Sequence, residues 1–148
     1  MAITLLWEDI KMSLYEQLTE AMLEENFYKT EEILSLISQE ESLVYAEKIL
    51  HFMEENPDVD YGMPGPVVHY LETLYGYGYE DLLYESVSRK PTVHTLWMLN
   101  RVLNLPLLAN REKYLSVMEK AASDPDGSDS IRSEARSYLE YQNGNGRK

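Results

Sequence analysis

The sequence contains no cysteine, which excludes disulfide bonds and thiolate chemistry. It also lacks any apolar run near the ~20 residues that a membrane-spanning helix needs. The N-terminus has no basic segment, and Glu8 and Asp9 interrupt its short apolar run, so we expect no signal peptide. These absences predict a cytoplasmic protein that neither crosses a membrane nor acts through disulfide exchange.

Positive charge is scarce in the first 88 residues, which hold nineteen Asp or Glu and only three Lys. The remaining residues hold seven acids and ten bases, so the formal net charge of −13 comes from the first part of the chain. Nucleic acids and anionic membranes bind clustered Lys and Arg, so we expect neither as a partner. The charge favours a basic partner, although an acidic surface can also serve solubility alone.

Motifs that carry chemistry are missing as well. There is no GxGxxG, P-loop or GxSxG motif, and the three histidines form no metal-ligand spacing. Asp58-x-Asp60-x-Gly62 begins like a calcium loop, but His69 stands where that loop needs a glutamate. We therefore predict no enzyme, no metal site and no cofactor. A helical enzyme would need His69, His94 and a carboxylate in one deep pocket.

Apolar residues recur at helical spacing along most of the chain. The pattern predicts eight helices, at about 6–22, 31–37, 43–55, 66–74, 79–89, 93–103, 111–122 and 130–141. We expect Thr30 to be the N-cap of the second helix. The longest break is 57–66, where three prolines and two glycines in ten residues forbid a regular element.

Eight helices with short connections and no strand pair predict an all-α protein. Their pairing favours a HEAT-like α-solenoid of stacked helical hairpins. No repeat of fixed period is visible, so an irregular helical bundle is the alternative. The length fits a single domain over residues 1–141, followed by a flexible C-terminal tail over 142–148.

Tyrosines gather between residues 61 and 84, a span that holds three acids and no Lys or Arg. Tyrosine rings give contact area at low entropy cost and carboxylates receive Lys or Arg, so this span suits a protein-binding surface. Alternatively, half of these rings simply pack between helices. We expect Tyr70 and Tyr84 in the core and Tyr61, Tyr77 and Tyr79 at the surface.

The candidate partner-binding residues are acids and tyrosines from the acidic part of the chain. They are Glu31, Glu32, Asp58, Asp60, Tyr61, Tyr77, Tyr79, Glu80 and Asp81.

Three segments between residues 57 and 104 are distinctive: 63–72 (MPGPVVHYLE), 75–80 (YGYGYE) and 89–101 (RKPTVHTLWMLNR). They resemble small helical immunity proteins that bacteria encode as partners of polymorphic or contact-dependent toxins. The resemblance implies a cytosolic protein that binds a cognate toxin domain tightly and blocks its active site or the access of its substrate. Many such toxins are basic nucleases, whose phosphate substrate an acidic inhibitor would mimic. The alternative is a HEAT-like adaptor for protein assembly.

Overall fold

The computed structural model describes residues 14–145, which form helices joined by loops and turns and contain no strand. A helical segment covers 14–23. It is followed by α2 (Phe27–Leu34), the short 3₁₀ helix η1 (Gln39–Glu41), α3 (Ser42–Glu55), α4 (Gly65–Glu72), α5 (Tyr79–Arg89), α6 (Val93–Leu103), α7 (Arg111–Ser123), α8 (Asp129–Glu140) and a closing π-type turn, η2 (Tyr141–Asn145). The predicted all-α class is confirmed. The part of the expected first helix before residue 14 lies outside the described residues.

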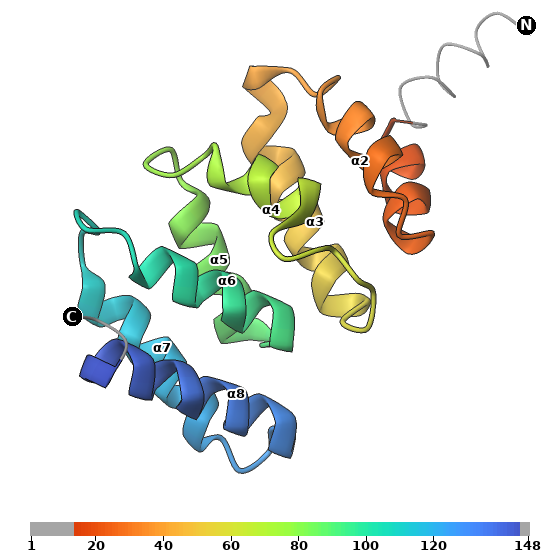
Figure 1. Cartoon of the computed structure of the whole chain (residues 1–148). Helices are drawn as coiled ribbons and strands as arrows, with labels where there is room; N and C mark the ends of the chain where they lie inside the picture. The colour runs from red at the N-terminus through yellow and green to blue at the C-terminus, as the bar shows by residue number, and fades with distance from the viewer. Residues whose placement is uncertain (1–13, 146–148) are drawn as a thin grey trace, which may run out of the picture.

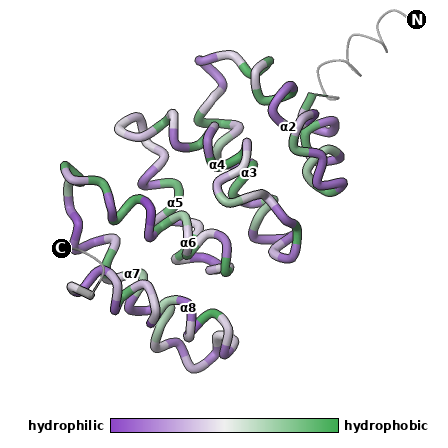
Figure 2. Tube along the Cα trace, in the orientation of Figure 1, coloured by the Kyte–Doolittle hydropathy of each residue, from purple (hydrophilic) through white to green (hydrophobic). Residues whose placement is uncertain are grey.

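The helices stack in chain order, from the first described helix at one end to α7 and α8 at the other (Figure 1). Helices two apart in the chain pack together: α2 on α4, α3 on α5, α5 on α7, and α6 on α8. Helices that follow each other also pack, as α5 does on α6 and α7 on α8. Residues of opposite hydropathy alternate along the helices (Figure 2), as expected where one face of each helix is buried.

Local sequence explains where several helices begin. Gly78 adopts φ 121°, a conformation that side chains disfavour, directly before α5. Thr92 caps α6 in a reciprocal capping box with Thr95, in which each side chain bonds the other residue's backbone N–H at 3.0 Å. α5 and α6 accordingly have the bounds that the sequence predicts.

The start of α2 differs from the prediction. Asn26, not Thr30, is the N-cap: its side-chain oxygen accepts a 3.0 Å hydrogen bond from the Lys29 amide. Thr30 lies buried inside the helix, where its hydroxyl donates to the Asn26 carbonyl at 2.8 Å. The helix therefore begins one turn earlier, and Phe27 and Tyr28 belong to it.

Four of the five tyrosines whose burial the sequence predicts lie differently, whereas Tyr77 is exposed as expected. Tyr61 and Tyr79 are 2% and 0% exposed, so the prediction that they lie at the surface is wrong. The segment after α3 folds back on that helix, and the Tyr61 hydroxyl donates to the Asn56 carbonyl at 2.8 Å. Tyr70 and Tyr84, expected in the core, are only partly buried at its edge.

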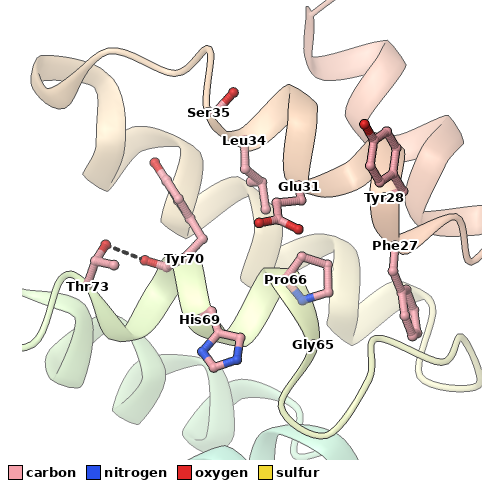
Figure 3. A pocket seen from close by; sticks show the side chains of 10 residues that line it. All are labelled: Phe27, Tyr28, Glu31, Leu34, Ser35, Gly65, Pro66, His69, Tyr70 and Thr73. Carbon is pink, nitrogen blue, oxygen red and sulfur yellow. Dashed lines mark hydrogen bonds between the residues drawn. The ribbon is translucent and has the colours of Figure 1, made fainter.

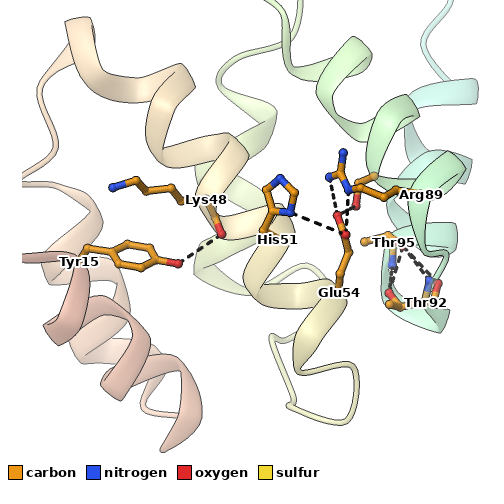
Figure 4. Close-up of polar contacts among 8 residues, drawn as sticks. Tyr15, Lys48, His51, Glu54, Arg89, Thr92 and Thr95 are labelled. Atoms are coloured by element: carbon orange, nitrogen blue, oxygen red, sulfur yellow. Dashed lines mark hydrogen bonds and ion pairs between the residues drawn. The ribbon is translucent and has the colours of Figure 1, made fainter.

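Two ion pairs tie helices that are two apart in the chain. Glu54 of α3 accepts hydrogen bonds from the Ser86 hydroxyl at 2.7 Å and from Arg89 Nη2 at 2.6 Å, both in α5 (Figure 4). Burial raises the pKa of Glu54, but these bonds outweigh it and hold the pKa below its ordinary value. Glu72 of α4 pairs with Arg101 of α6 at 2.5 Å in the same manner.

Residue 142 is more firmly packed than the sequence predicts. Gln142, expected to begin a flexible tail, is 5% exposed. Its amide nitrogen donates to Asn100 Oδ1 at 2.7 Å and to Asn104 Oδ1 at 2.9 Å, and its oxygen accepts from Arg111 at 2.8 Å. The tail prediction is therefore wrong at its first residue, because η2 docks on α6.

None of the helices within residues 14–145 is long and apolar enough to cross a membrane.

Candidate protein-binding surface

A groove runs between α2 and α4 and has an open volume of about 640 Å³ (Figure 3). Each helix contributes one face, with residues spaced three or four apart along it. The lining residues are Phe27, Tyr28, Glu31, Leu34 and Ser35 from α2 and its end, and Gly65, Pro66, His69, Tyr70 and Thr73 from α4 and its end. The earlier start of α2 adds Phe27 and Tyr28 to this lining.

Two further hollows continue this groove along the same edge of the stack. The second, of about 570 Å³, shares Tyr70 and Thr73 with the groove and extends over η1 to Leu43 and Tyr77. The third, of about 340 Å³, shares Leu43 with the second and lies between α3 and α5. The three hollows therefore form one concave strip, which we call the α2–α5 strip.

The strip exposes large apolar and aromatic side chains that a folded protein usually hides. Tyr28 is 81% exposed, Tyr77 74% and Val44 55%. Val44 lies near the start of α3 and faces away from the core, unlike the buried Ala46 and Ile49 of the same helix. Contiguous exposure of this kind marks interaction sites on folded proteins.

The charges on the strip have one sign. Its acids are Glu31, Glu40, Glu47 and Asp81, and among the described residues no Lys or Arg lines any of the three hollows. Within residues 14–145 the carboxylates of Glu31 and Glu40 form no ion pair. Asp81 differs, because Lys113 of α7 binds it at 2.9 Å and holds its pKa below the ordinary value.

The structure gathers only some of the predicted contact residues on this strip. Glu31, Tyr77 and Asp81 line it. Glu32 and Asp58 are exposed but line none of the three hollows.

Other predicted residues serve the local fold. The Asp60 carboxylate accepts a 2.8 Å bond from the Gly62 amide, and the Glu80 carboxylate accepts one of 2.9 Å from the Gly76 amide. Tyr61 and Tyr79 are buried and leave the candidate set.

Sequence reasoning missed most of the apolar part of the strip. Phe27 and Tyr28 were placed in a connection because Thr30 was taken as the cap. An N-cap at Asn26 would have placed Tyr28, Glu31 and Ser35 on one helical face. Leu43 and Val44 follow a polar segment in the sequence and carry no local signal that distinguishes them from core residues.

The histidines do not assemble the site that a helical enzyme would need. His69 lines the groove, whereas His94 lies between the rings of Tyr61 and Trp97. Burial lowers the pKa of His94 to about 4, and the Asp60 carboxylate opposes this effect. Within the described part of the chain, no three His, Cys, Asp or Glu residues are grouped so that they could hold a metal ion.

Comparison with known proteins adds no relative: no protein-family model, no curated protein and no solved structure matches the chain.

Proposed function

We propose that this protein is a HEAT-like stack of helical hairpins that binds a basic protein through the α2–α5 strip, and that this partner is a cognate toxin domain which it neutralises. One observation carries the proposal. The strip combines exposed aromatic and aliphatic side chains with carboxylates, and no basic side chain lines it within residues 14–145.

The composition of the strip fits a protein interface better than a small-molecule site. Tyr28, Leu43, Val44 and Tyr77 offer apolar area over several helices, which is typical of the core of an interface. Exposed tyrosine is also among the residue types that contribute most binding energy at interfaces. A row of open hollows suits an extended partner surface, whereas small ligands are bound in enclosed clefts.

The charge supports a basic partner and a rapid encounter. The excess of acids over bases lies in the first 88 residues, which include the whole strip. Complementary charge raises association rates toward ~10⁸–10⁹ M⁻¹s⁻¹ at low salt. We therefore expect an on-rate that falls steeply with ionic strength. An on-rate independent of salt would contradict the electrostatic part of the proposal.

The stacked hairpins support the HEAT-like description. Helices two apart in the chain pack side by side, as consecutive repeats of an α-solenoid do. Such stacks present long concave surfaces to their partners, and the α2–α5 strip spans several helices in this way.

Co-expression tests the proposal directly. The chain is produced together with the toxin domain encoded beside its gene, and growth rescue and formation of a stable complex are scored. We expect rescue by the wild type and loss of rescue by the double variant Glu31→Lys, Tyr77→Ala. The matched control is Glu119→Lys with Tyr141→Ala, which changes the same residue types on α7 and η2. Full rescue by the strip variant, or no complex with the wild type, would contradict the proposal.

An adaptor for protein assembly is the second candidate. Leu107, in the connection between α6 and α7, is 95% exposed. No residue of that connection lines the α2–α5 strip. An adaptor needs two separate surfaces, which the strip and Leu107 would provide. A stable complex containing two different proteins, lost on one side by Leu107→Ser, would favour this function over toxin neutralisation.

A further inference from the structure

The groove between α2 and α4 is shaped as a receptor for a positive charge. Both helices line it from their first turns, at Phe27 and Gly65, to their C-caps, Ser35 and Thr73. The second hollow begins where both helices end. The C-terminal ends of α2 and α4 therefore lie at the same end of the groove.

That end of the groove carries negative potential. A helix C-terminus bears a partial negative charge, and here two of them lie side by side. The hydroxyl groups of Ser35 and Thr73 donate to carbonyls of their own helices, each at 2.6 Å, so their oxygens remain available as acceptors. α2 has no basic residue in its last turn to offset this charge.

Glu31 adds a full negative charge to the groove. Figure 3 shows its carboxylate between the two helices, near Leu34, Pro66 and Tyr70. Within residues 14–145 it has neither an ion pair nor a side-chain hydrogen bond. The only ionisable nitrogens that line the groove belong to His69, whose ring is exposed.

Two tyrosines line the groove together with Glu31. Tyr28 lies on the same helix and Tyr70 on the opposite one, and both line the groove. The face of a tyrosine ring attracts cations within about 6 Å of its centroid. A planar guanidinium group can stack on such a ring and bond a carboxylate through two N–H groups, which an ammonium group cannot do.

We propose that this groove receives an arginine side chain of the basic partner, with its guanidinium group on Glu31 and against Tyr28 or Tyr70. The assignment rests on the proposed function for its context, because the partner supplies the arginine. The chemistry of the groove itself can be tested without that partner.

The test is an NMR titration of the whole chain with N-acetyl-L-arginine amide. The control ligand is N-acetyl-L-citrulline amide, which keeps the shape of the side chain but has no charge. We expect saturable shifts of the α2 and α4 amide resonances with the arginine ligand at millimolar concentration, and at least tenfold weaker binding of citrulline. Equal binding of the two ligands, or no saturable shift, would overturn the proposal.

Variants then locate the contact. Glu31→Gln should weaken arginine binding by about fivefold or more, and Tyr28→Ala should weaken it by a smaller factor. Glu32→Gln is the matched control, because Glu32 is the next residue along α2 and does not line the groove. An equal effect of the changes at 31 and 32 would reduce the result to general electrostatics and overturn the site. Unchanged spectra away from the groove show that each variant is folded.

The two proposals fail separately. Loss of arginine binding in the titration, together with intact growth rescue by Glu31→Gln, would refute the arginine site and leave toxin neutralisation standing. Arginine binding that depends on Glu31, together with failure of the wild type to rescue growth, would support the site and refute the proposed function.

Discussion

Protonation of His94 makes the free energy of unfolding of this protein depend on pH. This dependence begins at a higher pH than the titration of carboxylates. The ring centroid of His94 lies 5.3 Å from that of Tyr61 and 5.4 Å from that of Trp97. Its Nε2 atom is buried and has no hydrogen-bond partner among the described residues. His94 is partly buried, so a proton added to its ring would place a charge where little water can solvate it.

The sign and size of the effect follow from the two pKa values. In the folded state burial lowers the pKa of His94 to about 4, from an ordinary value of 6.5. Below pH 6.5 the unfolded chain therefore binds a proton that the folded chain does not, and the free energy of unfolding falls until the pH reaches about 4. At ~1.4 kcal/mol per pKa unit the total loss is about 3 kcal/mol, of which about 2 kcal/mol has occurred by pH 5.

Urea unfolding at pH 7 and pH 5, followed by circular dichroism, measures this loss. We expect the wild type to lose about 2 kcal/mol between the two conditions. His94→Phe keeps an aromatic ring between Tyr61 and Trp97 but cannot be protonated, so it should lose less than half as much. His69→Gln should behave as the wild type, because it leaves the buried ring in place. An equal loss in His94→Phe and wild type would refute the reasoning.

Four other substitutions probe buried polar groups, and unfolding free energies at pH 7 check each of them. Tyr79→Phe removes a buried hydroxyl that has no hydrogen-bond partner within the described residues, so it should raise the free energy of unfolding by about 1 kcal/mol. Tyr61→Phe removes a hydroxyl that bonds the Asn56 carbonyl, so it should lower the free energy of unfolding by about 1 kcal/mol. Glu54→Ala should lower the free energy of unfolding by about 2 kcal/mol, because it breaks the α3–α5 ion pair while Arg89 keeps some access to water. The control Glu55→Ala changes the exposed neighbouring residue and should lower it by less than about 0.5 kcal/mol, as is usual for surface substitutions. Gln142→Ala should cost about 1–2 kcal/mol by releasing η2 from α6, and no loss there would show that the docked turn contributes nothing to stability.

The sequence predicts helix bounds well where strong stop and start signals stand together. Lys90-Pro91-Thr92 ends one helix and caps the next, and Gly78 precedes α5, so both bounds of α5 and α6 follow from local chemistry. At α2 two capping residues, Asn26 and Thr30, stand one turn apart. Local rules do not choose between them, and the structure chooses Asn26 because Thr30 is buried inside the helix.

Burial of the tyrosines was harder to predict than the helices. A place in or beside a loop suggested exposure for Tyr61 and Tyr79, yet the loop folds back on α3 and the first residue of α5 points into the core. The groove depends on α2 and α4 lying side by side, about 40 residues apart in the chain. No local pattern contains that pairing, so the sequence offered Glu31 as a contact but not Tyr28 and Tyr70, which line the same groove.

The order of packing along the stack also bears on how the chain unfolds. The helix pairs that pack extensively are never more than two helices apart, so within residues 14–145 the two ends of the stack share no extensive contacts. Near one end of the described stack, α2 can unfold locally without disturbing α7 and α8, which do not pack extensively on it. Local unfolding of α2 would therefore remove one wall of the groove while the far end of the stack stays folded.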